Sequence, residues 1–151
     1  MKIEAYKKCA TYLDVLFQSL FDYILRNYKE DEILISLFAD HGQGYLVPEG
    51  QHFLSKERTK VAFMFRGGMS PKVSDELMST ADYVPIMCKL AGIPLRDVKI
   101  SGQLPVTFGG TKEREYTITE SLHPGDPYYA VVNTKDSTIF FDNMDITDDE
   151  G

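Results

Sequence analysis

The chain has 151 residues and a mass of 17.1 kDa, which is the size of one ordinary domain. A composition of 43% hydrophobic and 26% charged residues, with nine Phe and nine Tyr, is typical of a globular protein and excludes disorder over most of the length. The net charge of −7 comes largely from five acidic residues among the last ten, so the charge balance does not favour nucleic acid as a partner.

The N-terminal part predicts a long amphipathic helix. From about residue 4 to residue 28, apolar side chains recur at helical spacing and polar side chains fall largely on the opposite side. Cys9 lies in this segment and Cys88 in a second apolar helix further along. We therefore expect two buried thiols rather than a disulfide framework.

Two short apolar strands are predicted next. The near-continuous apolar run at 33–39 is typical of a strand that is covered on both faces in a parallel sheet. It stops at Asp40, His41 and Gly42, where glycine allows a sharp turn into a polar loop. The second strand is expected over 61–65.

A further helix is predicted from Thr80, as its N-cap, to Gly92, a C-terminal stop followed by Pro94. It completes an α/β core, in which helices and strands alternate along the chain.

Beyond Pro105 the hydrophobic period changes to two. This predicts strands over 116–119, 129–132 and 138–141, with a turn at 133–136 between the last two. His123 is expected to lie in a turn. These strands favour an antiparallel α+β appendage over a continuation of the parallel sheet.

Polar residues at the end of the first strand predict where ligands bind. Asp40 and His41 lie at the carboxyl end of that strand, and a neighbouring carboxylate and imidazole suit a divalent cation. An Asp in this position can also simply cap the next turn. The segment 51–72 carries five basic residues and one acidic residue, so it is either a solvated face or a surface that meets an anion.

Five segments stand out along the chain, and they are YLDVLFQSLFDYI (12–24), DEILISLFADHGQGY (31–45), KERTKVAFMFRGG (56–68), STADYVPIMCKLAGIPL (79–95) and EYTITESLHPGDPYYAVVNT (115–134). In this order they resemble the C-terminal half of the sulfatase and alkaline-phosphatase superfamily. The matching parts of that family are the helix before the metal-binding strand, that strand with its Asp-His-Gly pair, the following Glu-x-x-Arg-Val-Pro strand, the Asp-x-x-Pro-Thr helix and the late Tyr-rich strands. Three family positions differ, with Lys60 for the arginine, Ala62 for the proline and Ile86 for the threonine.

The resemblance implies an α/β fold. Residues 1–104 would form the C-terminal part of an alkaline-phosphatase-like mixed sheet flanked by helices, residues 105–143 a small antiparallel α+β appendage, and residues 144–151 an acidic tail.

The resemblance also implies the site residues. Asp40 and His41 would bind a divalent metal, Ca or Mg with Mn or Zn as alternatives, in a site that this chain holds only in part. His52 lies where related enzymes contact the transferred group or protonate the leaving group, although it can equally be an ordinary loop histidine. Lys56 and Arg58 would neutralise the anion of the substrate, unless they are simply solvated.

The family's nucleophile motif lies in its N-terminal half, and neither Cys9 nor Cys88 stands in such a motif. We therefore expect the C-terminal portion of a longer hydrolase of sulfate esters, inactive without its N-terminal half. A phosphoesterase or phosphoglycerol transferase of the same superfamily is one alternative, favoured by His41 in the metal pair. A non-catalytic binding or assembly module is another. Missing neighbours would leave the 33–39 strand or a face of the sheet uncovered, so a homo-oligomer is expected.

Overall fold

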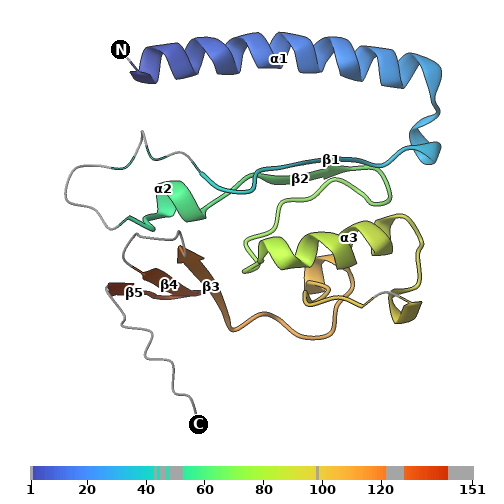
Figure 1. Ribbon diagram of the computed structural model, residues 1–151. Coiled ribbons are helices and arrows are strands. Elements are labelled where there is room, and N and C mark those ends of the chain that lie inside the picture. Colours follow the sequence, from blue (N-terminus) through green and yellow to red (C-terminus); the bar gives the residue numbers. More distant parts are fainter. Residues whose placement is uncertain are drawn as a thin grey trace.

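The computed structural model describes residues 2–42, 44, 47, 53–97, 99–121 and 128–142 and is a mixed α/β structure (Figure 1). Short 3₁₀ turns join several of the regular elements. The elements are α1 (Lys2–Asn27), β1 (Ile35–Phe38), α2 (Lys56–Thr59), β2 (Phe63–Arg66), α3 (Tyr83–Leu90), β3 (Tyr116–Ser121), β4 (Tyr129–Thr134) and β5 (Thr138–Asp142).

The described strands form two small antiparallel sheets. β1 pairs with β2, placing Ile35 opposite Arg66 and Phe38 opposite Phe63. The parallel pairing predicted for this strand is therefore wrong, and Phe38 is exposed rather than covered. A continuous apolar run shows which side chains of a strand favour burial, but neither what covers them nor the direction of the neighbouring strand.

The second sheet is an antiparallel meander in the order β3-β4-β5, which confirms the strands predicted after Pro105. The turn between β4 and β5 is closed by hydrogen bonds between Thr134 and Ser137, including Thr134 N to Ser137 O at 2.9 Å. Ala130 and Val131 of the central strand are buried.

An aromatic cluster joins the β1–β2 sheet to α3. The ring of Phe38 stacks on Tyr83 at 4.3 Å, and the rings of Phe63 and Phe65 also contact Tyr83. The Tyr83 hydroxyl and Ser36 Oγ are hydrogen-bonded at 2.8 Å. α1 and α3 lie on opposite sides of the β1–β2 ribbon (Figure 1), so this cluster attaches only the α3 side of the sheet.

Both ends of α3 follow from local sequence. Ser79, one residue before the predicted cap, forms a capping box with Asp82, and a 3₁₀ turn leads into the helix. Gly92 has φ +70°, and the N–H of Ile93 donates to Cys88 O at 2.8 Å, which closes the C-terminus as predicted.

α1 forms as predicted but is largely uncovered. Cys88 is buried in α3, whereas Cys9 on α1 is exposed, so the expectation of two buried thiols is wrong for Cys9. Periodicity identifies an apolar face without supplying the element that covers it. Within the described residues, no helix has the length and apolar character needed to cross a bilayer.

Candidate functional site

The candidate metal pair lies in the turn directly after β1. Side chains of Asp40 and His41 are 86% and 72% exposed, and Asp40 Oδ2 lies 3.9 Å from His41 Nε2. The other carboxylate oxygen of Asp40 accepts the backbone N–H of His41 at 2.9 Å. His41 Nδ1 lies 2.7 Å from the carbonyl oxygen of Gly42. A carbonyl only accepts hydrogen bonds, so this contact places the proton on Nδ1 and, in the neutral ring, leaves the lone pair of Nε2 available.

Glycine at position 42 brings α2 against this turn. The N–H of Gly42 donates to the carbonyl oxygen of Arg58 at 2.7 Å. A Cβ at this position would lie 1.9 Å from the carbonyl oxygen of Glu57, closer than any real contact. The absence of a side chain therefore permits the backbone approach that sets the Asp40–His41 turn beside α2.

Arg58 is held by an aromatic ring. Its guanidinium carbon lies 4.0 Å from the centroid of the Phe53 ring, and Phe53 in turn stacks on Tyr129 at 5.3 Å. The guanidinium also lies close to Gly44, where a Cβ would come within 2.3 Å of it. Through Phe53, this side chain therefore links Gly44 with β4.

The short helix α2 is preceded by the N-cap residue Ser55, whose Oγ donates to a Glu57 carboxylate oxygen at 2.8 Å. This side-chain hydrogen bond, with the Glu57 backbone N–H and the charge of Lys56, holds the pKa of Glu57 below its ordinary value. Glu57 therefore stays ionised at neutral pH.

The predicted site residues fall into three groups. Asp40, His41 and Arg58 belong to adjoining segments, because the Gly42 hydrogen bond joins the turn to α2. Lys56 is exposed on that same helix. His52 and His123 lie outside the described residues.

The donor set fits part of a metal site. Asp40 and His41 supply one oxygen and one nitrogen donor, and such ligands share a tetrahedral or octahedral cation when they stand ~3.0–3.4 Å apart. Rotation of an exposed carboxylate covers the difference from 3.9 Å. Over the described ranges, no group of three or more His, Cys, Asp or Glu side chains is positioned to hold a metal ion.

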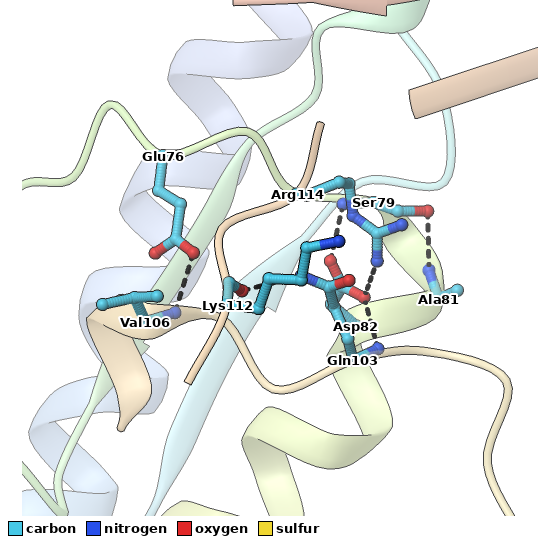
Figure 2. A network of polar contacts seen from close by, with 8 residues as sticks. All are labelled: Glu76, Ser79, Ala81, Asp82, Gln103, Val106, Lys112 and Arg114. Carbon is cyan, nitrogen blue, oxygen red and sulfur yellow. Dashed lines mark hydrogen bonds and ion pairs between the residues drawn. The ribbon is translucent and has the colours of Figure 1, made fainter. Parts of the chain in front are cut away.

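A second polar cluster, which sequence reasoning missed, surrounds Asp82 (Figure 2). The Asp82 side chain is fully buried and accepts the N–H of Ser79 and the N–H of Gln103, each at 2.9 Å, as well as a hydrogen bond from the Arg114 guanidinium. Arg114 is itself 20% exposed, and its Nε has no hydrogen-bond partner among the described residues. Three segments far apart in sequence therefore meet at one carboxylate.

Glu76 performs a similar task nearby, also in Figure 2. Its carboxylate oxygens accept the N–H groups of Val106 at 2.7 Å and Thr107 at 2.8 Å, at the start of a 3₁₀ turn. Burial raises the pKa of Glu76, but the hydrogen bonds from Thr107 and Val106 outweigh it and hold the pKa below its ordinary value. The Lys72 ammonium donates to the Thr107 carbonyl beside it.

A sequence signal existed for only part of this cluster. The Ser79 and Asp82 spacing is that of a capping box, with Asp in the place of the usual Glu or Gln. Nothing local connects Asp82 with Arg114, which lies 32 residues further along the chain. We assign the cluster to the fold, because its carboxylate is buried and saturated by protein donors.

In comparisons with known proteins, no family model, no curated protein and no solved structure gives a significant match to the chain.

Proposed function

We propose that the chain is the metal-binding C-terminal portion of a sulfatase-like hydrolase that acts on sulfate esters, with phosphate esters as the alternative substrate class. The observation that carries this proposal is the exposed pair Asp40 and His41 at the end of β1, whose donor atoms lie 3.9 Å apart. The sequence resemblance around this pair supports the same proposal.

Each member of the pair has a distinct task. Asp40 supplies a negative charge and a hard oxygen donor, while His41 supplies Nε2 because its other nitrogen is engaged by Gly42 O. A bound cation would polarise the ester oxygen and stabilise an anionic nucleophile. The nucleophile and the remaining ligands are proposed to come from the N-terminal half of the same enzyme.

Arg58 is proposed to meet the anion of the substrate. A guanidinium suits the planar geometry of two sulfate or phosphate oxygens, and the Phe53 ring orients it from one face. Lys56, exposed on the same helix, adds a second positive charge. This arrangement would neutralise charge on the transferred group beside the cation.

Metal binding by the chain itself tests the pair. Mn²⁺ is titrated into isotope-labelled protein, and paramagnetic broadening of backbone amide signals is followed by NMR. We expect broadening centred on residues 39–42, with a dissociation constant weaker than ~10⁻⁴ M because two donors fill only part of a shell. Substitution of Asp40→Ala together with His41→Ala should abolish it, whereas Asp136→Ala in the exposed β4–β5 turn should not. Equal broadening at other exposed carboxylates would refute a site here.

The reaction class has its own test. The chain alone should not turn over aryl sulfates or aryl phosphates with Ca²⁺, Mg²⁺, Mn²⁺ or Zn²⁺. Activity that disappears in Asp40→Ala would show that no further half is required. Reading the gene upstream of Met1 then separates the alternatives. A Cys/Ser-x-Pro-x-Arg motif supports a sulfatase, and a threonine nucleophile supports a phosphoglycerol transferase. The absence of both motifs supports a binding module.

A further inference from the structure

The apolar face of α1 is uncovered over its first five turns. Its large side chains there are between 39% and 50% exposed, whereas Phe21, Ile24 and Leu25 near the C-terminal end are half-buried. The exposed side chains on this face are those of Ile3, Tyr6, Leu13, Leu16, Phe17 and Leu20. An exposed apolar strip of this length is typical of a surface that binds another molecule.

Five of these six exposed residues, together with Ala10, follow a heptad repeat. Alternating steps of three and four residues lead along one line of the helix, a spacing that makes two helices wrap around each other. We call this line the α1 seam, formed by Ile3, Tyr6, Ala10, Leu13, Phe17 and Leu20. The repeat continues to Ile24, where the chain's own residues begin to cover the helix.

We propose that a second copy of this chain covers the α1 seam, with the two α1 helices antiparallel. One register aligns the whole uncovered segment with itself and leaves the half-buried end outside the contact. It places the small side chain of Ala10 at the crowded centre. The opposed residues are Ile3 and the partner's Leu20, Tyr6 and the partner's Phe17, and Ala10 and the partner's Leu13.

Charges beside the seam select this direction. Lys7 and Asp14 border the seam on the same side, and in this register Lys7 lies beside the partner's Asp14, twice by symmetry. Asp14 makes no ion pair with any described residue. Lys7 Nζ lies 3.6 Å from Glu4 Oε1, and both of these side chains are exposed. A parallel pair of helices would instead place Asp14 beside the partner's Cys9, without either ion pair.

The area available sets the strength of the contact. Together the exposed parts of the seam and of Leu16 on two helices amount to on the order of 1,000 Å², close to the lower limit for a specific interface. The dimer should therefore dissociate in the micromolar range rather than behave as an obligate assembly.

Sedimentation equilibrium over a wide range of chain concentration tests the contact. The wild-type chain should form dimers, and Leu13→Glu should raise the dissociation constant at least ~30-fold, because two charges enter the seam. Val15→Glu is the matched control, since Val15 is 59% exposed on the opposite face of the helix. Circular dichroism of both variants shows whether α1 remains helical.

A charge swap tests the direction. Lys7→Asp or Asp14→Lys alone should weaken the dimer about tenfold, because attraction becomes repulsion twice in each dimer. The double variant should restore the wild-type dissociation constant. Failure of that rescue would overturn the antiparallel register.

A wild-type chain that stays monomeric would overturn the proposal and leave the remainder of the hydrolase proposed above as the occupant of the seam. Monomers that bind anionic lipid vesicles would also overturn the dimer, and they would identify a membrane surface as the occupant of the seam. The dimer does not depend on Asp40 or His41, so failure of the metal titration and failure of dimerisation are separate results.

Discussion

Two aspartates of this chain, each at the end of a secondary-structure element, have opposite environments. Asp40 follows a strand, is 86% exposed and accepts one hydrogen bond from the next residue. Asp82 precedes a helix, is fully buried and accepts hydrogen bonds from Ser79, Gln103 and Arg114. The comparison teaches that saturation by protein donors assigns a carboxylate to the fold, whereas an exposed one with open oxygens remains available to a ligand.

The two environments also differ in what they connect. The partners of Asp82 come from positions 79, 103 and 114, so the carboxylate ties three segments together. The side-chain contacts of Asp40 lie within its own turn. Substitution of Asp82 should therefore lower the stability of the protein, whereas substitution of Asp40 should weaken ligand binding.

Substitution of Asp82 disrupts the buried cluster and should cause the greatest loss of stability. Asp82→Ala should lower the free energy of unfolding by about 3–5 kcal/mol, because it leaves the Arg114 guanidinium, which is only 20% exposed, without its partner. Asp40→Ala should change it by less than about 0.5 kcal/mol. Urea unfolding followed by circular dichroism measures both changes. Equal losses of stability would show that Asp40 and Asp82 do not differ in their contribution to the fold.

A smaller loss of stability is expected at Gly42, where α2 packs against the turn that holds Asp40 and His41. Gly42→Ala should cost about 1–3 kcal/mol, because its Cβ meets the backbone oxygen of Glu57, which cannot move without shifting the helix. Gly44→Ala is the control, since the nearest atoms to its Cβ belong to the Arg58 guanidinium, the end of a side chain that can shift, and it should cost less than about 1 kcal/mol. If thermal unfolding shows the same loss for both, the close approach at Gly42 is not what positions α2.

Glu76 gives a prediction that depends on pH. Glu76→Gln should cost about 1 kcal/mol at pH 7, because the charge that accepts two backbone N–H groups is lost. The pKa of Glu76 is lowered in the folded state from 4.5, so its stabilisation is complete above that value and disappears as the pH falls through the folded pKa. Unfolding curves of wild type and variant should therefore converge in acid. A gap that stays constant with pH would show that charge is not the cause.

The smallest effect tests the ring contact of Arg58. Arg58→Ala should reduce stability by about 0.5–1 kcal/mol through loss of the contact with Phe53, and Arg58→Lys should recover part of it. Chemical unfolding of the two variants provides the measurement. A loss as large as that of Asp82→Ala would move Arg58 from the candidate site to the fold.

Much of the local structure was predictable. Helical spacing located α1, the glycine at position 92 ended α3, and the period of two located β3, β4 and β5. These features depend on neighbours a few residues away, so the sequence contains the whole signal.

The errors have a common cause. The partner of β1 is antiparallel, and Cys9 is exposed although it lies on an amphipathic helix. In each case the pattern reports which side chains favour burial, but the covering element comes from elsewhere in the chain or from another chain.

By itself, the sequence determined the candidate pair, because Asp40 and His41 are adjacent and any fold that ends a strand there presents them together. Only the tertiary structure decided that Arg58 approaches this turn through Gly42 and that Asp82 meets Arg114. Adjacency is a covalent constraint that survives every conformation. Contacts between distant segments exist only after packing has overcome the entropy of closing the loops between them.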